Sequence, residues 1–372
     1  MSTIILLWEN FGPMHDDRVR ALVRACGGKA RIVGLELFGK SDTYAWDNEA
    51  GDDFEKITLF PGQSHSLSRT LKIAAVIVRH CRALNADQVF LCHYELPAIL
   101  LAACMLRLLG MKVYAMGDAK FDAYKRHLWR EVGKSFFFLP YVGALSNEVR
   151  SKDYLRFLGI KAGRIAAPYN TISIDRLRRL SGTVPAPNGA AFADRHFTIV
   201  ARFVREKNLE MALEAYAIYC RAADAPRQLH LCGSGELEPL LRQKVEELGL
   251  RDLVEFRGFL QSDGIAQALG TTLALILPSV QETFGFVVIE AQAMGLPVLV
   301  SENCGSRDTL VRTGVNGFVI EPDNPNGLAF FMSLLGRDEA LWQRMCVSAS
   351  SFAEKGDVDR FAEAVMTLVA DF

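Results

Sequence analysis

The 372-residue sequence has almost no net charge of either sign, −1 at pH 7, and it has no long apolar run. Its apolar stretch at 96–109 carries Arg107 and stops at Gly110, which is too short to span a bilayer. The N-terminus reaches Glu9 after a short apolar run without a basic segment, so it predicts a first strand and not a signal peptide. We expect no transmembrane helix and no nucleic-acid partner.

The sequence also lacks the cysteine and histidine spacings of metal sites. It has no C-x-x-C pair and no histidine cluster at zinc-ligand spacing. Its cysteines fall mostly inside apolar, periodic segments, as reduced core residues of a cytosolic protein do. They stand at positions 26, 81, 92, 104, 220, 232, 304 and 346. We therefore expect a cytoplasmic protein without a bound metal or cofactor.

The near-zero total conceals an uneven distribution of charge. Residues 1–180 hold 26 Lys and Arg against 18 Asp and Glu, and the remainder holds 16 against 25. A basic N-terminal half suggests an anionic partner such as a membrane surface, although scattered surface charges explain it equally well. Two segments, 69–82 and 124–138, mix basic with apolar residues. Such segments either lie on anionic lipid, as in a peripheral membrane protein, or are helices with one buried face.

Strand-like and helix-like patterns alternate along the whole chain, which predicts parallel α/β sheets. The length favours two domains. We expect an N-terminal domain at 1–180, a Gly- and Pro-rich linker at 181–195, a second domain at 196–355 and a last helix within 356–372 that packs back on the first domain. The predicted strands are 4–8, 31–37, 57–60, 89–92, 113–116 and 143–145, then 197–200, 229–232, 254–256, 273–277, 298–300 and 317–320. Two Rossmann-like domains facing across a cleft would bind ligands at the carboxyl ends of both sheets.

The stretch Pro278–Val300 predicts a strand-loop-helix-strand unit with two carboxylates, Glu282 and Glu290. We expect Phe284 and Gly285 in the first turn of the helix, and Glu290 about two turns further along it. Backbone amides near a helix N-terminus can hold an anion such as phosphate. Two glutamates at this spacing also occur on ordinary solvated helices, so the surrounding pattern P-S-x-x-E-x-F-G carries the prediction.

Two basic residues follow the predicted strand at 197–200. Arg202 and Lys207 lie near a helix start, where they oppose the helix dipole unless an anion lies between them. They can grip a diphosphate and stabilise the charge of a leaving nucleotide, or they can form a simple charge pair with Glu206. Glycines in G-S-G-E at 233–236 would let a ligand approach the backbone. This turn is not the G-x-G-x-x-G fingerprint, so a nicotinamide cofactor is disfavoured.

Residues 197–335 resemble the donor-binding domain of the retaining glycosyltransferases of family four, which have the GT-B fold. The resemblance rests on motifs in the family's order and spacing: R-F-V-R-E-K-N at 202–208, G-S-G-E at 233–236, F-R-G-F-L at 256–260, E-T-F-G-F-V-V-I-E at 282–290 and G-V-N-G-F-V-I-E-P at 314–322. The family transfers a sugar from a nucleotide with retained anomeric configuration, usually without a metal, and the absence of a D-x-D pair agrees with this.

The resemblance also implies roles for particular residues. Arg202, Lys207 and Glu282 are expected to be catalytic, the cations on the donor diphosphate and the glutamate on the sugar hydroxyls. Glu290 is expected to bind the ribose hydroxyls. The remaining expected donor contacts are Gly12, Asp118, Gly233, Gly235, Arg257, Phe259, Thr283, Phe284 and Gly285. Ser262 stands where a guanine-reading relative has an acidic residue, so a UDP-sugar is preferred over a GDP-sugar.

The N-terminal half departs further from the family. Its first loop has Gly12 followed by Pro13, where many relatives have a glycine pair. His15 is either an acceptor-side base or a helix-start residue. His93 and Lys120 are further acceptor-side candidates, with ordinary loop polarity as the alternative.

The predicted function is transfer of a sugar from a nucleoside-diphosphate sugar to a glycan or lipid-linked acceptor, in polysaccharide or glycolipid synthesis. Two alternatives stay open. One is a non-catalytic sugar-nucleotide-binding protein, which would have no reason to keep both the cations and the glutamates. The other is a GT-B epimerase or phosphorylase, which the glutamate motif disfavours.

Overall fold

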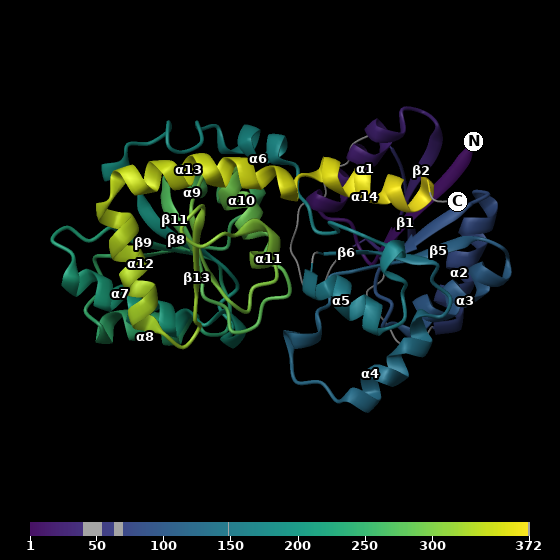
Figure 1. Ribbon diagram of the computed structural model, residues 1–372, viewed down its shortest axis with the longest axis horizontal. Helices are drawn as coiled ribbons and strands as arrows, with labels where there is room; N and C mark the ends of the chain where they lie inside the picture. Colours follow the sequence, from purple (N-terminus) through teal and green to yellow (C-terminus); the bar gives the residue numbers. More distant parts are fainter. Residues whose placement is uncertain (40–53, 63–69, 148, 371–372) are drawn as a thin grey trace. The chain divides into compact units, whose positions relative to one another are not determined.

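A computed structural model describes residues 1–39, 54–62, 70–147 and 149–370. The chain forms two compact units, one made of Met1–Ser173 with Asp357–Phe372 and the other of Ile174–Gly356 (Figure 1). The second unit is thus inserted between two segments of the first.

The described part of the first unit contains a seven-stranded parallel sheet, in the order β3-β2-β1-β4-β5-β6-β7. Its strands are β1 (Ser2–Trp8), β2 (Ala30–Phe38), β3 (Glu55–Phe60), β4 (Gln88–Leu91), β5 (Lys112–Gly117), β6 (Gly143–Ser146) and β7 (Ile165–Ala166). The helices are α1 (Pro13–Cys26), α2 (Thr70–Ala83), α3 (Pro97–Leu108), α4 (Leu128–Ser135), α5 (Val149–Phe157) and α14 (Val358–Ala370), with 3-10 turns η2 (Phe121–Ala123), η3 (Phe136–Phe138) and η4 (Ala162–Arg164).

Alternate side chains of β1 enter different layers of the core, because successive residues of a strand point to opposite faces. Ile5 packs in the layer that α2 and α3 cover. Ile4 packs in the layer that α1 and α14 cover. Helix α14 lies beside α1 (Figure 1), and its Phe361 is fully buried there. The last helix therefore completes the core of the first unit.

The described part of the second unit contains a six-stranded parallel sheet, in the order β10-β9-β8-β11-β12-β13. Its strands are β8 (His196–Val200), β9 (Leu229–Cys232), β10 (Val254–Gly258), β11 (Thr272–Leu277), β12 (Val298–Ser301) and β13 (Gly317–Ile320). The helices are α6 (Ile174–Ser181), α7 (Leu209–Ala222), α8 (Glu238–Glu247), α9 (Ser262–Gly270), α10 (Val287–Ala293), α11 (Arg307–Leu310), α12 (Pro325–Arg337) and α13 (Glu339–Ala353), with 3-10 turns η5 (Phe192–Asp194), η6 (Arg205–Lys207) and η7 (Glu354–Gly356).

Each predicted strand is present, with bounds that differ by at most two residues. Among the strands of the described residues, only the short β7 was not predicted. The division between the units differs from the expected boundary. The second unit begins at Ile174 and includes 181–195. This region is tied to its own unit, since the Ala186 amide donates to the Met294 carbonyl (2.9 Å) and Arg195 donates to the Thr272 carbonyl (2.8 Å).

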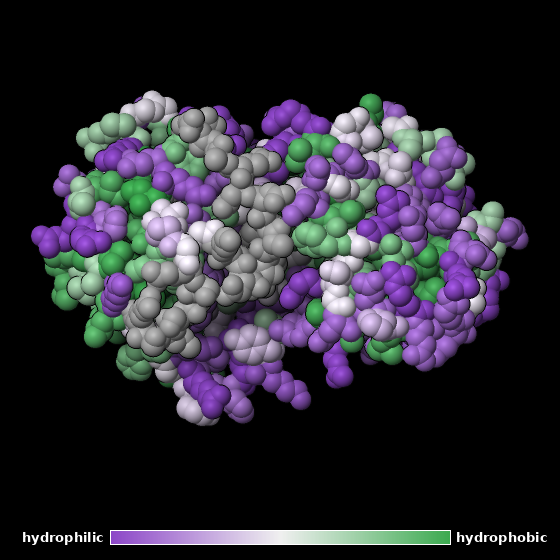
Figure 2. Space-filling view, turned by 180° about the vertical axis from the view of Figure 1, so that it is seen from behind, coloured by the Kyte–Doolittle hydropathy of each residue, from purple (hydrophilic) through white to green (hydrophobic). Residues whose placement is uncertain are grey.

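On the face drawn in Figure 2, hydrophobic residues are interspersed with hydrophilic ones. This is usual for a folded protein, because apolar atoms make up much of any surface. Within the described ranges, no helix has the length and apolar character needed to cross a membrane. All eight cysteines are free, and five of them are buried.

Candidate functional site

The strand order of the second unit brings the loop after β8 next to the loop after β11. β8 lies between β9 and β11, so the chain leaves β8 toward one side of the sheet and later returns on the other side. Ligands of open α/β sheets bind at such a switch point, beyond the carboxyl ends of the strands. Arg202 and Lys207 follow β8, and Ser279 and Glu282 follow β11. The two groups of predicted residues therefore meet at the switch point.

An ion pair between Lys207 and Glu282 joins these two loops. Both side chains are mostly buried, with 17% and 13% of their surface exposed. The Ser279 hydroxyl donates to the same carboxylate (3.3 Å). Because little water reaches the pair, the attraction between its two charges is screened less than in an exposed pair of the same geometry. The structure thus brings together a cation and a carboxylate that lie 75 positions apart in the chain.

Backbone hydrogen bonds hold the two loops in register. The Glu206 carbonyl accepts from the amides of Val280 (3.0 Å) and Gln281 (3.3 Å). Asn208, in the left-handed conformation with φ of 57°, donates from its side chain to the carbonyls of Pro278 (3.1 Å) and Pro322 (2.7 Å). These contacts fix the position of the Lys207–Glu282 pair.

Arg202 differs from Lys207 in its surroundings. Its side chain is exposed, and its guanidinium makes no hydrogen bond or ion pair with the residues that the structure describes. A guanidinium in this position retains all its donors for a ligand. It lies at the carboxyl end of β8, as the sequence predicts.

The segment before α10 differs from the expected helix start. α10 begins at Val287, after Phe284 and Gly285, so these two residues lie in a turn outside the helix. Gly285 has φ of 93°, and a Cβ there would lie 2.9 Å from Leu277 and 3.0 Å from the Cys304 sulfur. The Cys304 thiol in turn donates to the Phe284 carbonyl (2.9 Å). Close packing against the next loop therefore delays the start of the helix.

Glu290 accordingly lies in the first turn of α10, and not two turns along it. Burial raises the pKa of Glu290 from 4.5 to about 7, and the charge of Arg176 partly opposes this shift. A carboxyl group with such a pKa exchanges its proton near neutral pH. Perturbed carboxyl groups of this kind are common at binding sites.

The other predicted donor contacts lie at the carboxyl ends of β9, β10 and β11, at the same edge of the sheet. Cβ atoms at Gly233 and Gly235 would lie 1.9 Å from the Ala201 carbonyl and 2.5 Å from the Phe203 carbonyl, so only glycine fits beside the loop after β8. Arg257 is ion-paired with Glu255 (3.1 Å). Phe259 and Arg257 are both exposed, and Thr283 is partly buried beside Gly305.

The first unit has its own switch point between β1 and β4, and the predicted residues also gather there. Gly12 and His15 follow β1, His93 follows β4, and Asp118 follows β5. The Gly12 amide, however, donates to the His15 ring nitrogen Nδ1 (3.0 Å). The predicted phosphate contact of Gly12 would have to break this hydrogen bond.

His15 has the position of a helix-start residue, in the first turn of α1. Its ring packs against Trp8, with centroids 4.9 Å apart. Burial, with a contribution from Arg18, lowers the pKa of His15 well below its usual value, so the imidazole is neutral at pH 7. Since Nδ1 accepts a hydrogen bond, Nε2 carries the ring proton.

The pKa of His93 is shifted in the opposite direction from that of His15. The adjacent Cys92 thiol, and then Glu95, raise the pKa of His93 well above its usual value against the effect of burial. Its Nδ1 lies 3.4 Å from a Glu95 oxygen. His93 also has φ of 60°, which is unusual outside glycine.

Asp118 accepts a hydrogen bond from the side chain of Asn170 (3.0 Å), a residue that follows β7. Lys120, an acceptor-side candidate, is buried at 3% exposure. Asn170 was not predicted, because its partner Asp118 lies far away in the chain. Asn208 belongs to the motif at 202–208, but its hydrogen bonds to Pro278 and Pro322 were not predicted.

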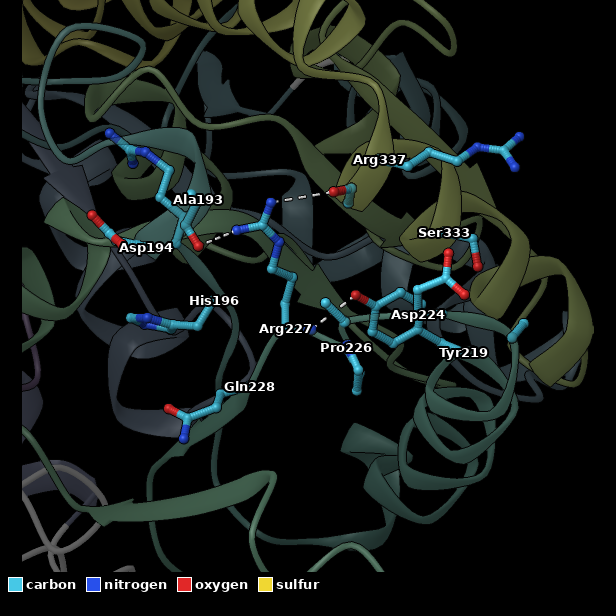
Figure 3. A pocket seen from close by; sticks show the side chains of 15 residues that line it. Ala193, Asp194, His196, Tyr219, Asp224, Pro226, Arg227, Gln228, Ser333 and Arg337 are labelled. Atoms are coloured by element: carbon cyan, nitrogen blue, oxygen red, sulfur yellow. Dashed lines mark hydrogen bonds between the residues drawn. The ribbon is translucent and has the colours of Figure 1, made fainter.

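A pocket of about 700 Å³ lies at the amino end of the second sheet, away from the predicted residues (Figure 3). His196 at the start of β8 and Gln228 before β9 line it. Arg227 crosses it, but its guanidinium donates to the carbonyls of Phe192, Ala193 and Gly336. The arginine therefore has a structural role there. Within the described ranges, no group of three or more His, Cys, Asp and Glu residues is arranged to hold a metal ion.

Part of the chain is similar in sequence to known glycosyltransferases. Residues 186–350 match the family model of glycosyl transferases group 1. The D-inositol 3-phosphate glycosyltransferase of Streptomyces bingchenggensis is 34% identical over 140 residues, 37% of this chain and 30% of the relative. An uncharacterized glycosyltransferase of Methanocaldococcus jannaschii is 31% identical over 137 residues, 37% of this chain and 34% of the relative. The chain thus matches about a third of the length of these curated relatives.

The fold agrees with solved structures over the whole chain. HepE of Anabaena, solved in complex with UDP, has a TM-score of 0.75 at 17% identity and full coverage of both chains. Sucrose-phosphate synthase of Thermosynechococcus elongatus has a TM-score of 0.75 at 17% identity, covering 100% of this chain and 99% of its own. The chain therefore has the GT-B fold of two Rossmann-like domains, and its residues 186–350 match the model of the glycosyl transferases group 1 family.

Proposed function

We propose that the protein is a retaining glycosyltransferase that moves a sugar from a nucleoside-diphosphate sugar to a glycan or lipid-linked acceptor in surface polysaccharide or glycolipid synthesis. The observation that carries the proposal is the Lys207–Glu282 pair at the switch point of the unit that matches the family model. A UDP-sugar is the favoured donor. The solved complexes of Anabaena HepE with UDP and with UDP-glucose share the fold and support this choice.

In this proposal the chemistry depends on charge stabilisation. As the bond between the sugar and the diphosphate breaks, the sugar carbon becomes positive and the diphosphate gains negative charge. Arg202 and Lys207 bind the departing diphosphate, so no resident metal is needed for this purpose. A leaving phosphate oxygen accepts the proton of the acceptor hydroxyl on the same face of the sugar, and the anomeric configuration is retained.

The carboxylates orient the donor. Glu282, held by Lys207 and Ser279, accepts hydrogen bonds from hydroxyls of the transferred sugar. Glu290 accepts from the ribose hydroxyls, for which its ionised form is the better acceptor. We therefore expect Glu290→Ala to weaken nucleotide binding and Glu282→Gln chiefly to lower turnover.

The test compares two lysines that each form an ion pair in the second unit. Lys207→Gln removes the cation at the switch point. Lys244→Gln removes a cation of α8 that pairs with Glu214 of α7. The full-length chain is assayed with a panel of nucleotide sugars for release of the nucleoside diphosphate, and with UDP by calorimetry. We expect Lys207→Gln to weaken UDP binding at least about tenfold, the usual size of a lost charge-assisted bond, and Lys244→Gln to have no effect.

Equal affinities for UDP in the two variants would contradict the donor site. The same experiment separates the alternative functions. A non-catalytic binding protein would be stabilised by a nucleotide sugar without releasing diphosphate. An epimerase would convert the sugar nucleotide without any acceptor.

A further inference from the structure

Helix α4 and the turn η3 that continues it carry a row of exposed apolar side chains. Leu128, Trp129, Val132, Phe136 and Leu139 are 62%, 70%, 52%, 67% and 76% exposed. Leu128 and Trp129 are neighbours, and the next three follow at intervals of three and four residues, so all five lie on one side of the helical segment. We call these five residues the α4 face. Contiguous exposed apolar residues of this size mark interaction sites in soluble proteins.

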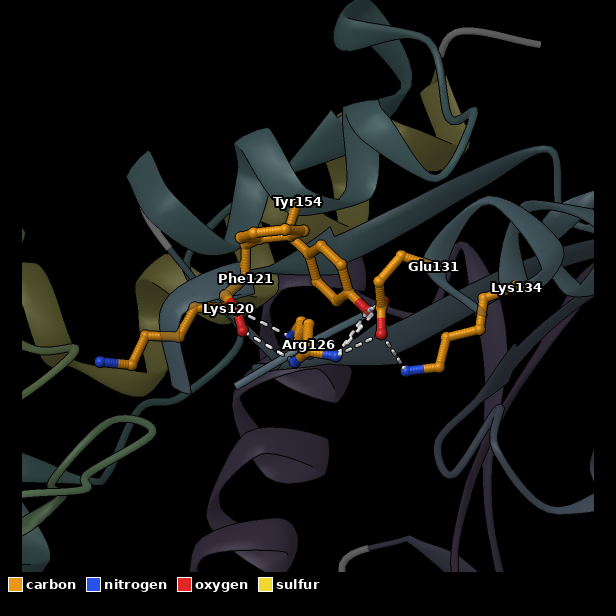
Figure 4. Close-up of polar contacts among 6 residues, drawn as sticks. All are labelled: Lys120, Phe121, Arg126, Glu131, Lys134 and Tyr154. Carbon is orange, nitrogen blue, oxygen red and sulfur yellow. Dashed lines mark hydrogen bonds and ion pairs between the residues drawn. The ribbon is translucent and has the colours of Figure 1, made fainter. Parts of the chain in front are cut away.

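The one acidic residue of α4 is turned inward, whereas the charged residues of an ordinary surface helix face the solvent. Glu131 is the one buried residue that the structure describes in α4. Its carboxylate accepts from the Tyr154 hydroxyl, from Lys134 (2.9 Å) and from Arg126 (3.3 Å) (Figure 4). These bonds hold the glutamate against the body of the unit, and the apolar residues are thereby directed outward.

Contacts on both sides of α4 fix this orientation. Before the helix, Arg126 also donates to the Lys120 carbonyl (2.8 Å), and its guanidinium lies 4.5 Å from the centre of the Tyr154 ring. After the helix, Phe138 is buried with its ring 4.7 Å from that of Tyr94. Because Phe138 lies seven residues after Glu131, both belong to the inner side of the segment.

Two exposed cations lie in the same segment as the α4 face. Residues 124–139 contain four Lys and Arg and a single carboxylate, the buried Glu131. Lys125 and Arg130 are exposed, and the Arg130 guanidinium lies 5.0 Å from the centre of the Trp129 ring. A tryptophan beside an arginine at the border of an apolar patch suits the boundary between lipid tails and headgroups.

The other basic, apolar segment of the sequence does not share this arrangement. In α2, the residues Ile73, Ile77 and Val78 are buried in the core that covers the sheet. Arg69, where that segment begins, lies outside the described residues. α2 is therefore an ordinary core helix, and the α4 face is the segment whose apolar side is available.

We propose that the α4 face is a docking surface for an anionic lipid bilayer, with its apolar side chains at the level of the lipid tails and with Lys125 and Arg130 among the headgroups. Charge distinguishes this partner from a second copy of the chain. In a symmetric dimer through the same face, the cations around each patch would approach one another and repel. An anionic surface instead neutralises them.

The test uses the full-length chain and vesicles of phosphatidylcholine, either alone or with about 30% phosphatidylglycerol. We expect sedimentation with the anionic vesicles, weakened by salt. Trp129→Ser with Phe136→Ser should reduce partitioning at least about tenfold, and Lys125→Gln or Arg130→Gln should reduce it about fivefold each. The control is Phe330→Ser on α12, which removes an aromatic residue of similar exposure (58%) from the second unit and should change nothing.

Each of the following outcomes would contradict the proposal. Equal binding to both kinds of vesicle would refute the role of charge, and equal binding by the double variant and Phe330→Ser would refute the α4 face. A chain that ignores vesicles but is a dimer by sedimentation, and becomes a monomer in the double variant, would show a protein partner instead. Melting temperatures report folding separately, and they should be unchanged because the substituted side chains are exposed. This proposal does not depend on the sugar-transfer function.

Discussion

Glu290 allows a quantitative prediction, because its carboxyl group has a different pKa in the folded and the unfolded chain. Burial raises the folded value from 4.5 to about 7, against the influence of Arg176. Below pH 4.5 both states hold the proton, and the group does not affect stability. Between pH 4.5 and about 7, Glu290 is ionised in the unfolded chain but still protonated in the folded chain. The free energy of unfolding therefore falls as pH rises through this range. Above pH 7 the full cost is present.

The cost follows from the size of the shift. At about 1.4 kcal/mol per pKa unit, the rise corresponds to about 3 kcal/mol of lost stability at pH 8. Glu290→Gln keeps the shape of the protonated side chain and cannot ionise. We therefore expect the variant to match the wild type near pH 4.5 and to exceed it by about 2 to 3 kcal/mol at pH 8.

The assay is urea unfolding followed by tryptophan fluorescence at several pH values. The second unit contributes Trp342, which is buried and donates to the Leu273 carbonyl (2.8 Å). Glu247→Gln, on an exposed glutamate of the same unit, is the control and should not change the pH dependence. A Glu290→Gln variant whose stability follows that of the wild type at every pH would refute the reasoning from burial.

Two further predictions concern stability. Gly233→Ala should cost at least about 2 kcal/mol, because its Cβ would lie 1.9 Å from the Ala201 carbonyl, whereas Gly163→Ala, which faces open space, should be nearly neutral in thermal unfolding. Phe361→Ala on α14 should cost about 3 to 5 kcal/mol in urea unfolding of the first unit, since its ring is fully buried there. A loss below about 1 kcal/mol would mean that α14 is dispensable for that core.

The strands were predictable because their apolar residues come in short runs that are bounded by turn residues and polar segments. The runs at 229–232 and 317–320 match β9 and β13 residue for residue. Such a local signal needs no knowledge of the partner strands. The start of α10 was predicted about three residues too early, because Gly285 packs against Leu277 and Cys304 from other elements.

The residues of the site could be predicted from the sequence, but the contacts between them could not. Lys207 and Glu282 were both identified from motifs, yet their ion pair depends on the order of β8 and β11 in the sheet. The hydrogen bond from the Gly12 amide to the His15 ring was likewise not apparent from sequence. α2 and α4 have similar patterns, and contacts with distant residues, among them Tyr154 and Tyr94, hold α4 with its apolar side outward.

The return of α14 to the first unit has a consequence for how the protein forms during synthesis. Phe361 and Val365 share a core layer with Ile4 and Trp8, so the ribosome has made nearly the entire chain before that layer can close. Most domains fold in order from the N-terminus as they emerge. Here the inserted second unit can mature first, while the first unit has an open hydrophobic face that a chaperone can recognise until the last helix arrives.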